Sequence, residues 1–108
     1  RALREEFWQN AKVLGPADTY RLNLQKAGRV ADFIELGELM AIDALERTES
    51  CGCHLREESQ TGEGEALRDD QNFSYVSAWG YTGDDTRPEF NKPPLGFENV
   101  KLSQRSYK

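Results

Sequence analysis

The sequence predicts a small, mostly α-helical protein: a three-helix bundle, then a long loop, then a C-terminal tail that forms a two-stranded β-hairpin. Three observations lead to this prediction. Apolar residues recur at helical spacing over the first half, residues 50–72 show no sustained period, and from residue 72 onward the apolar residues alternate. The length of 108 residues fits one domain. Within it we expect a helical bundle over 1–50, a motif loop over 51–72 and a hairpin tail over 73–108.

The first two helices are predicted from apolar spacing and from stop signals. Helix one carries Leu3, Phe7, Trp8, Ala11 and Leu14 at helical intervals and ends at Gly15-Pro16. Helix two follows, with Asp18 or Thr19 as its cap, and ends near Gly28 or continues through Val30. Its apolar side is formed by Tyr20, Leu24, Ala27 and Ala31.

The third helix is predicted from Asp32 to about residue 50. Asp32 followed by Glu35 resembles a capping box ahead of "FIELGELMAIDALERTES". Acidic residues gather in one stripe of this helix, while apolar residues fill most of the remaining circumference. Such a helix must be buried on several sides, and we expect part of its surface to dock on something outside the sequence.

Two strands are predicted after the loop. "NFSYVSAWGY" places Phe73, Tyr75, Ser77, Trp79 and Tyr81 on one face. A turn region, "TGDDTRPEFNKPP", separates it from a second alternating segment, "LGFENVKLSQ". A two-stranded antiparallel ribbon is marginal alone, so it needs a surface to pack on.

Charge and hydropathy exclude several classes of partner. The net charge is -5 and the pI is about 4.9, which disfavours nucleic acid and anionic membrane surfaces. No apolar run is long enough to span a bilayer, and the first residues do not resemble a secretory signal. Because the chain opens at Arg1 and its one methionine is Met40, we expect a fragment of a longer polypeptide.

The stretch "ERTESCGCHLREE" concentrates both cysteines and the one histidine. Cys51, Cys53 and His54 are zinc-ligand types, but a structural site usually needs a second pair of ligands, which is missing. A disulfide between residues two apart is strained, so a reducing compartment fits better. We favour two buried or partly buried thiols at a helix end over a metal site or a Cys–His nucleophile pair.

Charged residues around the histidine suggest a structural cluster. His54 and Arg56 could pair with the acids that surround them, which are Glu57, Glu58, Asp69 and Asp70. Such a cluster would pin the loop, although a solvated charged loop explains the same residues. The glycines of "TGEGEA" do not form a phosphate cradle, because acids lie between and beside them.

The same stretch resembles the C-terminal region of succinate dehydrogenase and fumarate reductase flavoprotein subunits. The family motif reads A-L-x-R-x-E-S-R-G-A-H-x-R-x-D, followed downstream by R-D-D. The matching positions are Ala44, Leu45, Arg47, Glu49, Ser50, Gly52, His54, Arg56, Arg68, Asp69 and Asp70. Arg105-Ser106-Tyr107 also resembles the family's ending, whereas Cys51, Cys53 and Glu58 depart from the motif and indicate a variant bacterial branch.

The resemblance implies a C-terminal helical domain of an enzyme that interconverts succinate and fumarate with FAD. It implies that electrons pass through an iron–sulfur subunit toward quinone, on the inner face of the bacterial cytoplasmic membrane, with a membrane anchor as a further partner. The family's flavin and dicarboxylate motifs lie upstream, so we expect no cofactor, metal or catalytic residue in this chain. The motif residues from Arg47 to Asp70 would seat the domain against the flavin domain, and the hairpin tail would pack on the bundle or on that flavin domain.

Two alternatives belong to different classes. L-aspartate oxidase and related flavoproteins have a similar C-terminal helical domain, although the long aromatic tail after Arg68-Asp69-Asp70 favours the succinate and fumarate group. A free-standing helical adaptor with a Cys-Gly-Cys-His metal clip is the other alternative.

Overall fold

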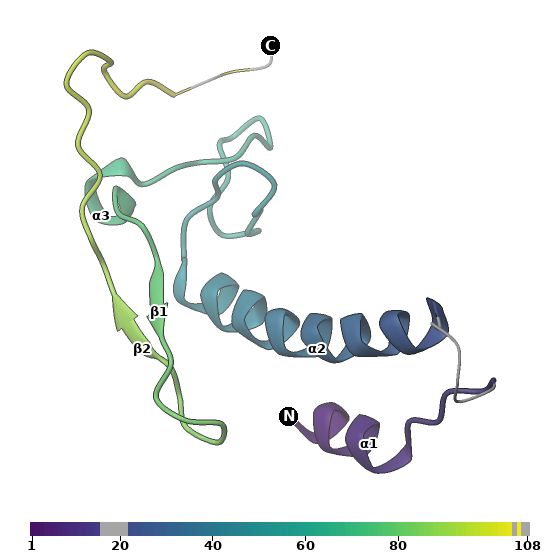
Figure 1. Cartoon of the computed structure of the whole chain (residues 1–108). Coiled ribbons are helices and arrows are strands. Elements are labelled where there is room, and N and C mark those ends of the chain that lie inside the picture. The colour runs from purple at the N-terminus through teal and green to yellow at the C-terminus, as the bar shows by residue number, and fades with distance from the viewer. Residues whose placement is uncertain (16–21, 105, 107–108) are drawn as a thin grey trace. The chain divides into compact units, whose positions relative to one another are not determined.

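The computed structural model describes residues 1–15, 22–104 and 106. Along the chain these residues form α1 (Ala2–Asn10), α2 (Leu22–Glu46), α3 (Asp70–Phe73), β1 (Ala78–Gly80) and β2 (Glu89–Asn91), as Figure 1 shows. The predicted fold class is confirmed: the protein is small and mostly helical, with a two-stranded antiparallel hairpin near its C-terminus. The chain divides into two compact units, residues 1–42 and 43–108.

In the first unit, α1 is shorter than its apolar pattern predicts. The helix ends at Asn10 because Ala11 is extended, with φ -63° and ψ 125°, so Leu14 lies outside it. The Arg1 guanidinium donates to a Glu38 carboxylate oxygen of α2 over 2.6 Å. This hydrogen bond holds the pKa of Glu38 below its usual value.

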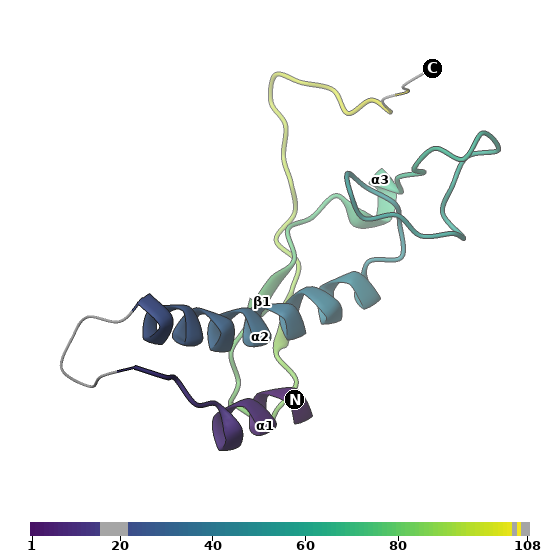
Figure 2. The ribbon, with the colours of Figure 1, turned by 90° about the vertical axis from the view of Figure 1, so that its right-hand side faces the viewer.

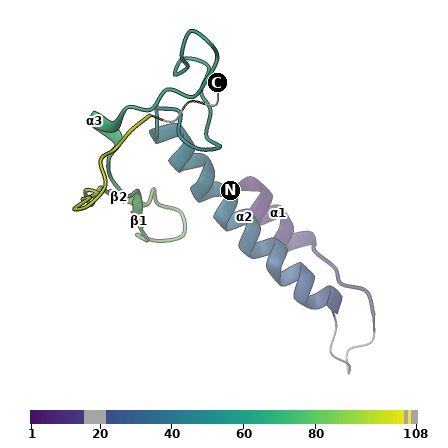
Figure 3. The ribbon, with the colours of Figure 1, turned by 90° about the horizontal axis from the view of Figure 1, so that it is seen from above.

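The second and third predicted helices are one continuous helix, so the predicted boundary near residues 28–32 is wrong. Figure 3 shows α2 running without a break. Gly28 lies in its interior, where a glycine costs only about 1 kcal/mol and does not end a helix. Asp32 and Glu35 are both exposed on α2. The three-residue spacing of a capping box is also the spacing of neighbours on one helix face, so this spacing alone does not mark the start of a helix. The predicted cap of the second helix, at Asp18 or Thr19, and its residue Tyr20 lie outside the described residues.

Neither long helix buries a side chain. Among the described residues, no side chain of α1 or α2 is buried. The sequence predicts instead that the apolar third helix, which is part of α2, is buried on several sides. In the whole described chain, Tyr75 is the one buried hydrophobic residue.

The hairpin forms, but its second strand is not where the alternation predicts it. β1 pairs antiparallel with β2, with Trp79 opposite Phe90, and Figure 2 shows the two strands side by side. β2 lies in the predicted turn region, between Pro88 and Pro93. The segment over 95–104 is irregular. Proline lacks a backbone N–H and is found mainly at the ends and edges of strands. The residues between Pro88 and Pro93 keep their backbone N–H groups and can form strand hydrogen bonds.

Aromatic side chains form the centre of the second unit. The Trp79 and Phe90 rings stack with centroids 4.2 Å apart, and Tyr75 meets Phe90 edge-on at 6.0 Å. The Trp79 indole N–H donates to an Asp43 carboxylate oxygen over 3.0 Å. This bond attaches β1 to the last turn of α2, the point at which the motif loop begins.

Candidate functional site

A buried carboxylate lies at the start of the motif loop. Only 4 % of Glu49 is exposed. One of its oxygens accepts a hydrogen bond from the Arg47 guanidinium, and the other accepts the Asp69 backbone N–H over 2.8 Å. A buried charge is tolerated when it is paired and hydrogen-bonded in this way. Glu49 therefore joins the end of α2 to the segment that starts α3.

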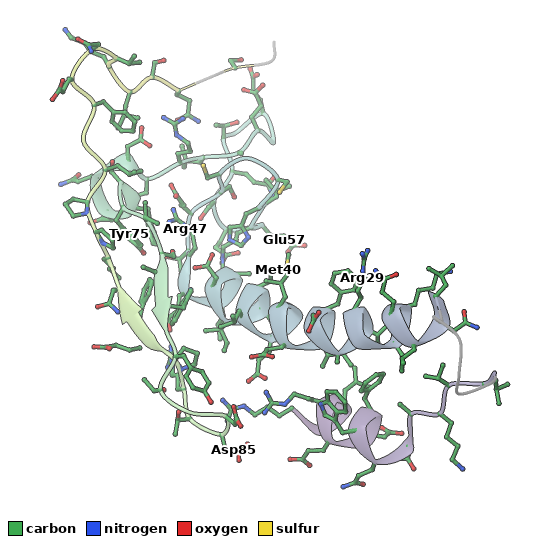
Figure 4. The ribbon with its side chains drawn as sticks, viewed as in Figure 1. Arg29, Met40, Arg47, Glu57, Tyr75 and Asp85 are labelled. Carbon is green, nitrogen blue, oxygen red and sulfur yellow. The ribbon has the colours of Figure 1, made fainter. Side chains whose placement is uncertain are left out.

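Arg47 connects this carboxylate to the aromatic centre. Its guanidinium lies 5.1 Å from the Tyr75 ring centroid and 5.5 Å from that of Phe73, within cation–π range. It also donates to the backbone carbonyls of both residues, each over 3.4 Å. Figure 4 shows Arg47 and Tyr75 next to each other. The planar guanidinium can make these contacts together, which a lysine could not.

Ser50 closes the loop on itself. Its side chain is fully buried, and its hydroxyl accepts the Arg56 N–H over 2.8 Å and donates to the Arg56 carbonyl over 3.3 Å. Its own N–H donates to the Leu67 carbonyl over 3.1 Å. Ser50 thus connects two parts of the loop, at Arg56 and at Leu67, through hydrogen bonds made from a fully buried position.

His54 ends a tight turn and binds backward to the helix end. Cys51 and His54 exchange two backbone hydrogen bonds of 2.9 and 3.1 Å. Gly52, at the first central position, has a φ of +60°, as type II′ turns require. The His54 Nε2 lies 2.9 Å from the Arg47 carbonyl oxygen. Because a carbonyl only accepts, Nε2 carries the proton in this arrangement.

Arg56 binds both the helix end and a neighbouring acid. Its guanidinium donates to the Ala44 carbonyl over 3.2 Å and to Glu58 over 2.6 Å. The Ala44 carbonyl belongs to the last turn of α2, where carbonyls lack partners within the helix. The pKa of Glu58 is lowered, first by its own backbone N–H and then by Arg56.

The Arg-Asp-Asp triplet organises the end of the loop. Asp69 caps α3 by accepting the Asn72 N–H over 3.2 Å. Arg68 pairs with Asp70 through bonds of 3.0 and 2.7 Å, and this pairing raises the pKa of Arg68. Arg68 also donates to the Ser103 carbonyl over 3.0 Å. The triplet therefore holds the tail segment against the loop.

The predicted charge cluster exists only as separate pairs. Arg56 pairs with Glu58, while the hydrogen bond of the His54 ring within the described ranges goes to the Arg47 backbone carbonyl. Asp69 caps a helix. The buried Glu49 is the acid that binds both Arg47 and the Asp69 N–H. It is a motif position, but the spacing of charged residues did not indicate this role. The sequence feature that could have indicated the buried Glu49 is Arg47, two residues earlier. The aromatic partners of Arg47 are 26 and 28 residues away, so no local pattern predicts them.

The cysteines are not at buried positions. Cys51 and Cys53 are both free and exposed, so the prediction of buried or partly buried thiols is wrong: the turn closed by Gly52 lies on the surface. Among the described residues, no three His, Cys, Asp or Glu side chains gather as a metal site would require. His54 also has its Nε2 occupied by a backbone carbonyl.

The described residues do not form the strand–turn–helix arrangement of a Rossmann-type dinucleotide site. Such a site needs a parallel strand, a glycine-rich turn and a helix N-terminus that faces the pyrophosphate. The described sheet has two antiparallel strands. The glycines at 62 and 64 belong to a small turn, closed by hydrogen bonds between Thr61 and both Gly64 and Glu65.

Across the described ranges, no helix has the length and apolar character needed to cross a bilayer.

Comparison with known proteins gives one match. A family model described as "Fumarate reductase flavoprotein C-term" matches residues 1–107, which include all the motif positions from Arg47 to Asp70. No curated protein and no solved structure matches the chain significantly.

Proposed function

The chain belongs to the family of fumarate reductase and succinate dehydrogenase flavoprotein C-terminal domains, and from this premise we propose that it is the C-terminal helical domain of a succinate:quinone oxidoreductase flavoprotein subunit. In the proposed parent enzyme, succinate and fumarate interconvert with FAD, and electrons pass through an iron–sulfur subunit to quinone. The chain itself supplies no catalytic residue and is inactive alone. The match over 1–107 carries this proposal.

The role that we propose for the chain is structural. The motif residues Arg47, Glu49, Ser50, Gly52, His54, Arg56, Arg68, Asp69 and Asp70 fix the loop and seat the domain against the flavin domain. In support, Glu49 and Ser50 are buried and hydrogen-bonded across the loop. A loop held in this way presents its exposed side chains without a large entropy cost when it docks.

The partners follow from the same premise. We propose that the domain contacts the flavin domain of its own polypeptide, and that the parent assembles with an iron–sulfur subunit and a membrane anchor on the inner face of the bacterial cytoplasmic membrane. The near absence of buried hydrophobic side chains among the described residues supports a domain that completes its core against a neighbour.

Succinate oxidation tests the proposal. The native polypeptide that carries this chain, purified from its cells, should contain FAD and reduce an artificial electron acceptor when succinate is added. Residues 1–108 expressed alone should show neither property. A native polypeptide without flavin and without succinate-dependent reduction would refute the proposed function, and activity of the 108 residues alone would refute the structural role.

The seating role has its own test. In the active enzyme, His54→Ala and Arg56→Ala should each increase proteolysis within residues 47–70 and lower flavin retention, because each removes a bond to the end of α2. Lys101→Ala, in the exposed irregular tail, is the control. If loop proteolysis rises while flavin retention is unchanged, the motif acts only within the domain.

A further inference from the structure

We infer that Cys51 and Cys53 form a redox modification site, an exposed dithiol that hydrogen peroxide oxidises to a Cys51–Cys53 disulfide and that a thiol reductant restores. The inference goes beyond the proposed function and does not depend on it. The family motif has arginine at the position of Cys51 and alanine at that of Cys53, so both thiols are features of this chain and not of the motif.

Both thiols are accessible to a small oxidant. Cys51 and Cys53 are free and exposed, whereas a buried structural cysteine is inert. Oxidation of an accessible thiol gives a sulfenic acid, which a neighbouring resolving thiol converts to a disulfide before further oxidation makes the damage irreversible. Each of these two cysteines has such a neighbour two residues away.

The turn brings the two residues within disulfide range. Cys51 and Cys53 are the first and third residues of the turn that Cys51 and His54 close with hydrogen bonds of 2.9 and 3.1 Å. Two peptide units span at most about 7 Å when fully extended, and a turn is shorter. The two Cα atoms therefore fall within the separation of about 4.4–6.8 Å that disulfides bridge.

Gly52 allows the backbone to adjust when the ring closes. It has a φ of +60°, and a Cβ added there would meet nothing within 4 Å. A glycine between the two cysteines can change its φ and ψ at little steric cost. The residues on either side are held, because Ser50 is fully buried and the His54 ring lies 2.9 Å from the Arg47 carbonyl oxygen.

A disulfide across so short a ring is strained, and strain makes it easy to reduce. In a reducing compartment, such a bond is transient and serves as a redox sensor and not as a structural staple. The dithiol is therefore the resting form, and the disulfide is the form that appears when peroxide rises.

The oxidation proceeds in two steps. One thiolate attacks a peroxide oxygen; the O–O bond breaks, the sulfur becomes a sulfenic acid, and the other oxygen leaves as water after taking up a proton. The second thiolate then attacks that sulfur; the S–S bond forms, and the sulfenic oxygen leaves as a second water. Two electrons pass from the sulfurs to the peroxide. Two molecules of a thiol reductant reverse the change by exchange and become a disulfide themselves.

The same pair is a poorer match for a metal ion. A structural zinc site is almost always four-coordinate, and within the described ranges no three His, Cys, Asp or Glu side chains gather as a metal site requires. The Nε2 of the adjacent His54 already binds the Arg47 carbonyl. Oxidation by peroxide needs the two sulfurs alone.

Peptide mapping of the native polypeptide that carries this chain tests the inference. The folded protein is treated with hydrogen peroxide, the remaining thiols are alkylated, and the protein is digested with trypsin. Cleavage after Arg47 and Arg56 places both cysteines in one peptide, residues 48–56, so the result does not depend on cysteines elsewhere in the polypeptide. A second sample is incubated with glutathione before alkylation. Cys51→Ser and Cys53→Ser are the matched controls, since each lacks the resolving thiol.

The expected result is a 48–56 peptide that has lost two hydrogens and that regains them with glutathione. A thiol on so short a linker has an effective concentration of about 1 mM, so at about 0.1 mM peroxide and equal reactivity the disulfide should exceed the sulfinic acid by at least about tenfold. In each single variant, the remaining cysteine should instead give the sulfinic acid or a mixed disulfide with glutathione.

Three outcomes would overturn the inference. Thiols that react only after the protein is unfolded in urea are not accessible in the native polypeptide. Sulfinic acid as the main product of the unaltered protein means that neither cysteine resolves the other. A disulfide that excess glutathione does not reduce is a structural bond. None of these results bears on flavin content, so each leaves the proposed function standing.

Discussion

Replacing Arg47 with methionine should open the motif loop. The change leaves the Glu49 carboxylate buried, at 4 % exposure, without its cationic partner. Breaking a buried ion pair costs about 3–5 kcal/mol, and the two ring contacts add about 0.5–1 kcal/mol each. Because Arg47 is 19 % exposed, we take the lower value for the ion pair alone, about 3 kcal/mol, as the minimum loss, which corresponds to a factor of at least about 100 in the opening equilibrium.

Hydrogen exchange at the Asp69 amide measures this opening directly, because that N–H donates to Glu49. In Arg47→Met its protection should fall by about two orders of magnitude. Arg87→Met is the matched control: Arg87 pairs with Glu46 but is 67 % exposed, so the loss should be about 0–1 kcal/mol. Glu49→Gln added to Arg47→Met should restore part of the protection, because the amide keeps an acceptor oxygen without the charge. Equal effects of Arg47→Met and Arg87→Met would refute the reasoning.

Three further predictions concern the loop and α2. Gly52→Ala should destabilise the turn by about 1–2 kcal/mol in thermal melts because of its φ of +60°; Gly62→Ala, where φ is not positive and space is open, should be neutral, and equal losses would contradict this explanation. Ser50→Ala leaves the Arg56 N–H without its acceptor and should cost about 1–3 kcal/mol in urea unfolding; a loss below about 0.5 kcal/mol would contradict it. The pKa of Glu38 is lowered from 4.5 in the fold, so its contribution to stability is complete above pH 4.5 and is lost as the pH falls through its folded value. Glu38→Gln should flatten stability against pH in that window, and an unchanged profile would refute the assignment.

The sequence indicates the types of element better than their limits. The helical spacing of α2 and the alternation that contains β1 are local patterns, and both elements form. The break near Gly28 and the strand over 95–104 were wrong, because a capping-box spacing also occurs inside helices and an alternating segment needs a partner to become a strand. The strand that does form, β2, lies between the prolines at 88 and 93.

The candidate site follows the same division. Family resemblance identifies Glu49 and Ser50, but their burial depends on partners such as Leu67 and Asp69, far along the chain. The prediction that the cysteines are buried or partly buried was wrong, because their exposure depends on which way the turn at Gly52 faces.

The most direct test of the central claim is to isolate the native polypeptide with an antibody against residues 1–108 and to determine its mass and flavin content. We predict a polypeptide several times heavier than the 12.3 kDa of this chain, with about one flavin per molecule. A flavin-free polypeptide of about the mass of the chain itself would contradict the assignment to a succinate and fumarate flavoprotein.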